Sequence, residues 1–265
     1  MYENLLYERT NAVCRITLNR PQVYNALSPG LIRDITAAIE AAGADDQVRV
    51  VVLTGAGDKA FSSGADLKEG AMKAATSGGQ FALGDSLRTT YHPMIRAIRN
   101  ISKPVIGRIN GVAAGAGCSL ALACDVTICT DEAYFSQIFV NIGLMPDAGS
   151  TFFLPRLIGS QKAFDLCSTG RRVYGPEAAR IGLVNQSVPT HRLDEAVEEV
   201  VAYYASAPTL AIGAMKQVLN QSLFSDLDAQ LEQEADHQDI LGRSSDVAEG
   251  ISAFLMKRKA NFSGK

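Results

Sequence analysis

Two turns rich in glycine and alanine constrain this chain more than any other feature. They are residues 61–66, Phe-Ser-Ser-Gly-Ala-Asp, and residues 110–119, Asn-Gly-Val-Ala-Ala-Gly-Ala-Gly-Cys-Ser. Each follows an apolar run that predicts a buried strand, and each exposes main chain with almost no side chain in the way. Two such turns that face each other can direct two backbone N–H groups at one oxygen, which builds an oxyanion hole from main chain alone.

Each turn taken alone also has a structural explanation, because glycine permits tight turns and close packing in any α/β protein. The second turn leads into an apolar run over residues 120–124 that we interpret as helical. Backbone N–H groups at a helix start are unpaired and partly positive, which suits the oxygen of an enolate. The occurrence of two such turns, each after a strand, favours the functional interpretation.

The composition excludes several classes of function. The chain has 265 residues, of which 47% are hydrophobic, and this is enough for one large core. A net charge of −3 gives no general attraction to nucleic acid or to an anionic membrane. No apolar stretch approaches the roughly 20 residues of a membrane helix, and the acidic start does not have the layout of a signal peptide. We therefore expect a cytoplasmic protein that binds neither nucleic acid nor membrane.

The cysteines and histidines do not predict a metal or redox site. The five cysteines form no C-x-x-C pair, so we expect buried reduced thiols. His92, His191 and His237 lie far apart in the chain and have no ligand spacing, which argues against zinc and against a histidine-based triad. No G-x-G-x-x-G or Walker-type loop is present, so nothing indicates a nucleotide cofactor.

Strands and helices alternate through the first part of the chain. The pattern predicts strands over residues 12–18, 48–54, 104–109 and 126–129, and helices over residues 86–100, 176–181 and 193–206. Ser28 followed by Pro29 predicts the start of a further helix, and Gly182 predicts the end of the short one. The weakly patterned segment 71–84 is interpreted as a mobile loop or a loosely held helix.

From Pro208 onward the pattern becomes purely helical. Helices are predicted over residues 209–222, 226–241 and 246–258. Asp246 followed by Glu249 predicts a capping box at the start of the last helix. The change of pattern places a boundary between residues 1–207 and residues 208–265.

With these residues in view, the chain resembles the enoyl-CoA hydratase/isomerase family, the crotonase superfamily, over nearly its whole length. The segments that carry the resemblance are 19–21, 25–27, 50–55, 60–67, 103–106, 110–125, 178–184 and 254–259. The resemblance implies an α/β fold, with a crotonase-like spiral of ββα units that carries the CoA and acyl sites in residues 1–207. It also implies that residues 208–265 are a helical trimerisation region. The expected partner is an acyl-CoA thioester substrate, the expected assembly a homotrimer or a dimer of trimers, and no cofactor is expected beyond the CoA of the substrate.

The family motifs also imply roles for individual residues. The oxyanion hole would consist of the N–H groups of Ala65 and Ala116. The residues expected near the CoA or the acyl group are Ser63, Gly64, Asp66, Leu67, Gly115, Phe139, Phe254 and Lys257. The last two resemble positions that reach CoA bound to an adjacent subunit, although Lys257 is equally well explained as a solvated cation in the last turn of a helix.

The two glutamates of the family's hydratases are missing from this chain. Ser119 and Phe139 stand at the matching positions, and neither can act as a general base. Phe139 would also make the pocket apolar and hostile to water. One acid remains nearby, Asp147 in Pro-Asp-Ala-Gly, and isomerase-type members, including those of phenylacetate breakdown, resemble this segment with an Asp as acid and base. The alternative for Asp147 is a turn or helix-cap residue.

We therefore expect an enoyl-CoA double-bond isomerase that stabilises a thioester enolate and uses one aspartate as acid and base. A hydratase with non-standard catalytic groups is the first alternative. A non-catalytic subunit that binds acyl-CoA is the second.

Overall fold

The computed structural model of the chain describes residues 2–67 and 83–265. Most of the segment interpreted above as a mobile loop or loose helix, residues 71–82, lies outside the described residues. Its last two residues begin a short helix, α3 (Leu83–Ser86).

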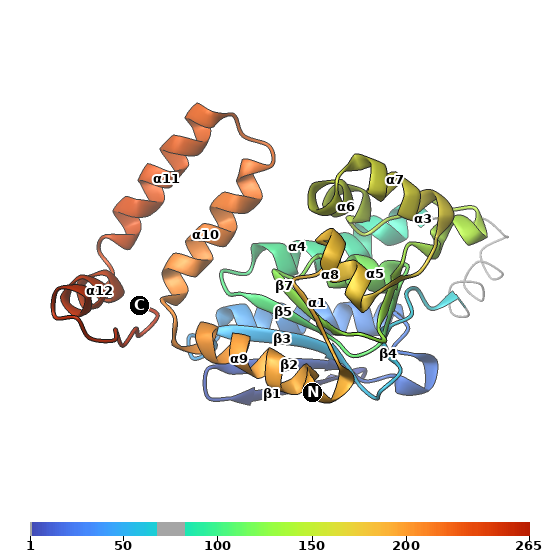
Figure 1. Ribbon diagram of the computed structural model, residues 1–265, viewed down its shortest axis with the longest axis horizontal. Helices are drawn as coiled ribbons and strands as arrows, with labels where there is room; N and C mark the ends of the chain where they lie inside the picture. The colour runs from blue at the N-terminus through green and yellow to red at the C-terminus, as the bar shows by residue number, and fades with distance from the viewer. Residues whose placement is uncertain (1, 68–82) are drawn as a thin grey trace.

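A six-stranded sheet forms the base of the fold (Figure 1). Its strands, in spatial order, are β1 (Leu5–Thr10), β2 (Val13–Leu18), β3 (Val50–Gly55), β5 (Val105–Ile109), β7 (Val126–Thr130) and β10 (Gln186–Val188). Strands β1 and β2 form an antiparallel hairpin, and all the later neighbours are parallel. The predicted strands are confirmed as β2, β3, β5 and β7. The pattern misses β1, because only Leu5 of that strand is buried and no alternation results.

Short strands form a second sheet, in the order β4 (Ala60–Ser62), β6 (Val112–Ala114), β8 (Tyr134–Ser136) and β9 (Val173–Tyr174). Strands β4, β6 and β8 are parallel to one another. Along the chain, each of these three strands directly follows a strand of the first sheet, and helices follow each pair. The core is therefore a spiral of ββα units.

Helices cover both faces of the first sheet. They are α1 (Pro29–Ala44), α4 (His92–Asn100), α5 (Ala116–Leu122), α6 (Ser150–Ile158), α7 (Ser160–Thr169), α8 (Gly175–Ile181) and α9 (Leu193–Ser206), with single turns of 3-10 or π helix at Pro21–Val23, Leu87–Tyr91, Ile138–Ile142 and Thr190–Arg192. None of the described helices is long and apolar enough to cross a membrane.

The core lies on both sides of β3. Val51 and Leu53 face the main cluster, which includes residues of α1, α4 and α5, while Val50 and Val52 face α9. A strand buried on both faces needs a continuous β-branched run rather than alternation. The predicted cap of α1 is confirmed, because the Ser28 hydroxyl accepts the Leu31 N–H at 3.2 Å. All five cysteines are free thiols, and four are buried.

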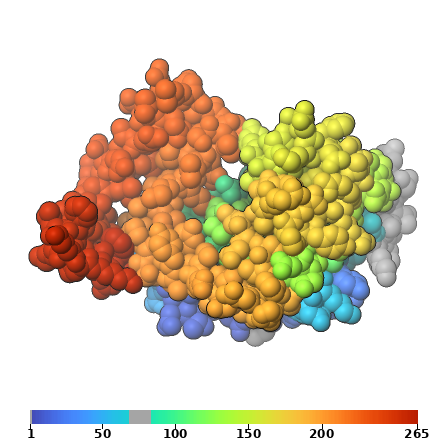
Figure 2. All heavy atoms as spheres, viewed as in Figure 1, coloured from blue at the N-terminus to red at the C-terminus, as the bar shows by residue number. Residues whose placement is uncertain are grey.

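Three helices, α10 (Thr209–Ser222), α11 (Leu227–Leu241) and α12 (Ser245–Leu255), extend from one end of the core as an arm (Figures 1 and 2). Large apolar side chains are exposed along the arm, and they include Leu210, Met215, Leu219, Phe224, Leu227, Leu231, Ile240, Ile251, Phe254 and Leu255. Monomeric proteins rarely expose apolar surface on this scale.

The predicted capping box of Asp246 and Glu249 is wrong. The N-cap of α12 is Ser244, whose hydroxyl accepts a first-turn N–H. The carboxylates of the predicted box bind other groups, because the chain folds back onto the helix after it ends. Asp246 accepts the Ser263 N–H at 2.6 Å, and Glu249 pairs with Arg258 at 2.6 Å.

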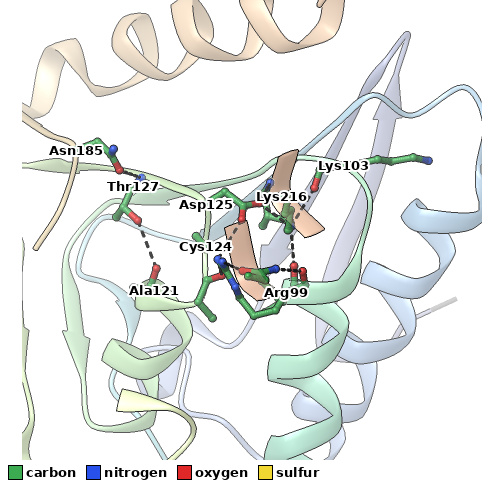
Figure 3. A network of polar contacts seen from close by, with 12 residues as sticks. Arg99, Lys103, Ala121, Cys124, Asp125, Thr127, Asn185 and Lys216 are labelled. Carbon is green, nitrogen blue, oxygen red and sulfur yellow. Dashed lines mark hydrogen bonds and ion pairs between the residues drawn. The ribbon is translucent and has the colours of Figure 1, made fainter. Parts of the chain in front are cut away.

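A buried ion pair ties the arm to the core (Figure 3). The ammonium of Lys216, on α10, donates to the Asp125 carboxylate at 2.7 Å and to the carbonyl oxygens of Ile98 and Lys103 at 2.8 and 3.1 Å. The other oxygen of Asp125 pairs with Arg99 at 3.1 Å. Only 7% of Lys216 is exposed, and its burial lowers the pKa of the ammonium while Asp125 opposes that shift.

Replacing Lys216 with methionine should destabilise the protein by about 1–3 kcal/mol, because the Asp125 carboxylate keeps only Arg99 as its cation and buried acceptors lose a donor. The change also leaves the Ile98 and Lys103 carbonyl oxygens without their donor. Chemical denaturation measures the loss. The matched control is Arg88→Met, which breaks an exposed pair with Asp85 and should have a far smaller effect. Equal losses in the two variants would contradict the role given to Lys216.

Candidate active site

The two glycine-rich turns emerge at the same edge of the second sheet. Strands β4 and β6 are parallel neighbours, with Ala60 paired to Val112 and Ser62 to Ala113. The segments that follow the two strands therefore leave from their adjacent carboxyl ends. This brings residues 63–65 next to residues 115–117.

Glycine is required where the two turns touch. A β-carbon on Gly117 would lie 2.3 Å from the Ser62 carbonyl oxygen. A β-carbon on Gly64, which has φ +97°, would lie 2.7 Å from the Ala114 oxygen and 3.4 Å from the Ala116 nitrogen. Neither approach leaves room for a side chain, so these glycines set the distance between the turns.

The N–H of Ala65 is directed away from Leu27, the residue with which Ala65 forms a β-bridge. In the bridge between Leu27 and Ala65, the Leu27 N–H donates to the Gly64 oxygen at 2.8 Å, and the Asp66 N–H donates to the Leu27 oxygen at 3.2 Å. Leu27 thus bonds the residues on either side of Ala65. The Ala65 N–H has no part in this bridge.

The N–H of Ala116 is the first of helix α5. Gly115, with φ +52°, precedes it and donates its own N–H to the Ser136 oxygen at 2.9 Å. A first-turn N–H has no acceptor within its helix. The geometry thus presents two main-chain donors, from Ala65 and Ala116, on turns in direct contact, as an oxyanion hole requires.

Asp147 lies in the turn that leads into α6. The N-cap of that helix is Gly149, so Asp147 does not serve as the cap. Its Oδ1 is buried and has no hydrogen-bond partner among the residues that the structure describes. Burial raises the pKa of the Asp147 carboxyl from 3.8 to about 6. An under-hydrated carboxylate with a pKa near neutrality is suited to taking and returning a proton.

The residues at the two hydratase positions are a buried hydroxyl and an aromatic ring. Ser119, on α5, is fully buried. Phe139 is 7% exposed, and its ring reaches to within 3.9 Å of where a β-carbon of Gly115 would lie. The second turn is therefore covered by an aromatic ring rather than by a carboxylate.

The other predicted residues of the first turn line its outer side. Asp66 pairs with Arg20 at 3.0 Å, and the Ser63 N–H donates to the Tyr24 oxygen at 2.9 Å. Leu67 is 59% exposed. The turn is thus anchored to residues 20–27 and presents an apolar side chain to solvent.

Helix α12, which carries Phe254 and precedes Lys257, lies at the end of the molecule opposite β4 (Figure 1). Phe254 is 84% exposed on α12, and Lys257 follows that helix with φ +51°. Within one protomer these two residues do not meet the residues around Ala65, Ala116 and Asp147.

The sequence interpretation misses Tyr91. Its side chain is buried, and the charges of Asp147 and Asp66 add to burial in raising the pKa of its phenol. Tyr91 therefore lies near both acids. It is the last residue of the π-helical turn Leu87–Tyr91. Such a turn has more residues than an α-helical turn, so the side chains after it no longer follow the 3.6-residue period by which buried positions are predicted.

The described residues hold no group of three or more His, Cys, Asp or Glu side chains placed to bind a metal ion.

Comparison with known proteins gives one consistent result. The family whose model matches residues 8–265 is described as "Enoyl-CoA hydratase/isomerase". The chain is 40% identical over 264 residues to the "Probable enoyl-CoA hydratase" of Rhodobacter capsulatus, covering 100% of this chain and 99% of that one. It is 36% identical over 265 residues to the 1,2-epoxyphenylacetyl-CoA isomerase of Escherichia coli, with 100% of both chains covered. The crystal structure of an enoyl-CoA hydratase from Bacillus anthracis superimposes with a TM-score of 0.89 at 33% identity, covering 99% of this chain and 100% of that one.

Proposed function

This chain belongs to the enoyl-CoA hydratase/isomerase family, and we propose that within the family it is an enoyl-CoA double-bond isomerase with Asp147 as its single acid and base. Its fold is the crotonase-like spiral that the sequence predicts, and acyl-CoA chemistry follows from the family. One observation carries the choice of reaction. The site offers a carboxyl at Asp147 whose buried Oδ1 has no hydrogen-bond partner among the described residues, while the two hydratase positions hold Ser119 and Phe139.

The reaction is a proton shift within one substrate. The Asp147 carboxylate takes a proton from the α carbon of a 3-enoyl thioester, and the electron pair of that C–H bond delocalises into the adjacent carbonyl to give an enolate conjugated with the 3,4 double bond. The dienolate oxygen receives hydrogen bonds from the Ala65 and Ala116 N–H groups. Protonated Asp147 then returns the proton to the γ carbon, which yields the conjugated 2-enoyl thioester. Atoms and electrons balance with no co-reactant, so we propose that no cofactor is used.

Hydration is the second candidate, because hydratases are among the chain's relatives. Adding water needs a group that activates the water as well as one that protonates the α carbon. Phe139 covers the second turn where hydratases of the family carry one of their glutamates. The single carboxylate therefore favours isomerisation over hydration.

We further propose that CoA binds along residues 63–67 and that an adjacent subunit completes this binding site. Phe254 and Lys257 are exposed on the arm and distant from their own site, so they are available to a neighbouring one. The exposed apolar side chains of the arm support a homotrimer or a dimer of trimers. Sedimentation analysis of the purified protein tests this assembly.

The proposed reaction is tested by offering a 3-enoyl-CoA and following the product by proton NMR in deuterium oxide. The expected product is the conjugated 2-enoyl-CoA, formed at a rate that depends on Asp147, and any solvent deuterium that it gains during conversion enters at the γ carbon. Binding of the thioester without turnover would contradict the proposed function and support a binding subunit.

The pH dependence of the reaction follows from the Asp147 carboxyl. Its ionised form is the base, so kcat/KM should fall about tenfold for each pH unit below the pKa of about 6 and level off above it. An ordinary aspartate would move this inflection to lower pH by about two units, because its pKa is 3.8. Initial rates across the acidic and neutral range measure the inflection, and a profile flat through this range would contradict Asp147 as the base.

A further inference from the structure

A chain of buried hydrogen bonds runs behind the active site and ends at the main chain of Asp147. The Gln137 Nε2 donates to the Ser150 hydroxyl at 3.0 Å. The hydroxyls of Ser150 and Ser119 are 2.7 Å apart, and the Ser119 hydroxyl lies 3.0 Å from the Asp147 carbonyl oxygen. All three of these polar side chains are almost fully buried, at 0% exposure for both serines and 2% for Gln137.

The hydrogen bonds that link Gln137, Ser150, Ser119 and the Asp147 carbonyl all run in one direction. The Asp147 carbonyl can only accept, so the Ser119 hydroxyl donates its one proton there. Ser119 therefore accepts a hydrogen bond from the Ser150 hydroxyl. Because the one proton of that hydroxyl points to Ser119, Ser150 accepts its other hydrogen bond from the Gln137 amide. A second acceptor for Ser119, the Gly115 oxygen, is more distant at 3.4 Å. The shorter contact therefore decides the direction.

The turn at residues 147–149, which these hydrogen bonds hold, is strained. Ala148 has φ +48° and Gly149 has φ +88°, so two successive residues after Asp147 are left-handed. A left-handed residue with a β-carbon persists only where its surroundings enforce the conformation. The Asp147 oxygen is fixed from two sides here, since it also accepts the Ser150 N–H at 3.1 Å.

Ser119 lies on α5, whose first N–H belongs to Ala116. A single hydroxyl therefore joins the helix that supplies one oxyanion donor to the turn that supplies the carboxyl. An error in the spacing of these two groups would misplace the base relative to the enolate oxygen, and small displacements of reacting groups lower rates steeply.

We propose that Ser119 alone is the positioning residue that holds the Asp147 turn at its working distance from the oxyanion hole, through the bond from its hydroxyl to the Asp147 carbonyl oxygen. This inference rests on the proposed function and deepens it. The position at which hydratases of the family carry a glutamate would here hold a group that touches no substrate and acts through Asp147. Substituting glutamate there would break the chain of hydrogen bonds and would not convert the enzyme into a hydratase.

The test uses Ser119→Ala in the full-length protein, with Ser150→Ala as the matched control and Asp147→Asn as the reference. Ser119→Ala removes the donor to the Asp147 carbonyl and should lower kcat about 10- to 100-fold while KM changes little. The inflection of its pH profile should move to lower pH, because a released turn admits water to the carboxyl. Ser150→Ala removes a residue of equal size and burial but leaves Ser119 free to donate, so its kcat should stay close to wild type.

The possible outcomes separate the two proposals. A folded Ser119→Ala enzyme with the wild-type kcat and pH profile would overturn the positioning role, provided that Asp147→Asn is inactive. Equal losses of kcat in the Ser119 and Ser150 variants would also overturn it, because they would mean a purely structural network. Full turnover in Asp147→Asn would overturn both proposals together. Should Ser119→Ala fail to fold, Ser119→Cys decides, since the thiol preserves the packing but donates weakly: reduced kcat supports the role, and wild-type kcat overturns it.

Discussion

Replacing Asp147 with asparagine should lower kcat for a 3-enoyl-CoA by about 100- to 10,000-fold, which is the usual contribution of a positioned acid and base. Asparagine keeps the shape of the side chain but cannot take a proton from the α carbon. KM should change little, because the proposed CoA contacts lie on residues 63–67 and on the arm. Steady-state kinetics with the purified variant measure both parameters.

The same variant should unfold at a higher temperature than wild type at neutral pH. Burial raises the pKa of the Asp147 carboxyl from 3.8 to about 6, so its ionised form is disfavoured in the folded protein. The native state binds the proton more tightly, and stability is therefore lost as pH rises through the window between these two values. A neutral amide removes this cost, and the advantage of the variant should vanish below pH 3.8.

A matched control is Asp165→Asn, which removes an exposed carboxylate on α7 that pairs with Arg171 at 2.9 Å. This variant should retain wild-type kcat and gain no stability at neutral pH. Wild-type turnover in Asp147→Asn would remove Asp147 from the mechanism. Loss of turnover accompanied by loss of stability would indicate a structural residue instead.

Replacing Gly117 with alanine should lower kcat about 100- to 1,000-fold, which is the effect of losing one oxyanion donor. The added β-carbon would lie 2.3 Å from the Ser62 carbonyl oxygen and 2.8 Å from the Ser62 carbonyl carbon and β-carbon. Backbone cannot give way as a flexible side chain can, so the two turns must separate. The N–H groups of Ala65 and Ala116 would then no longer converge on one oxygen.

The control for this substitution is Gly43→Ala, within α1. Its β-carbon would meet only the Ile101 side chain at 3.4 Å, an ordinary contact, and alanine favours the helix. We expect that control to be fully active and somewhat more stable than wild type. A folded Gly117→Ala enzyme with the wild-type kcat would contradict the main-chain oxyanion hole.

Much of the fold is predictable because burial leaves a readable pattern. Strand β3 is buried on both faces, and its continuous apolar run, Val50–Leu53, indicates this. The Ser28 cap and the Gly182 helix end are local effects that need no tertiary information. Strand β1 is paired on one side only and mostly exposed, so its residues are free to vary in polarity and give no periodic signal.

The errors arise where distant segments compete for the same groups. Asp246 and Glu249 have the spacing of a capping box, yet the returning tail binds both carboxylates, and Ser244 takes the cap. The boundary near residue 208 and the role of residues 208–265 in assembly remain predictions.

The candidate site also has parts that the sequence predicts and parts that it does not. The two turns are visible in the sequence because the proposed oxyanion hole uses main chain and therefore requires small residues. The network of Gln137, Ser150 and Ser119 is not visible, since three polar residues from separate elements meet only after the chain folds. Tyr91 is hidden for a related reason, because its orientation depends on a π-helical turn.

The central claim is that one carboxylate and two main-chain donors catalyse a proton shift without adding water. The most direct measurement gives the wild-type enzyme a 3-enoyl-CoA and a 2-enoyl-CoA in separate reactions, detects added water by mass spectrometry and locates the double bond by proton NMR. We predict that the first is converted to its conjugated isomer with no change in mass, and that the second gains no water. Formation of 3-hydroxyacyl-CoA from the 2-enoyl thioester faster than isomerisation of the 3-enoyl thioester would contradict the account.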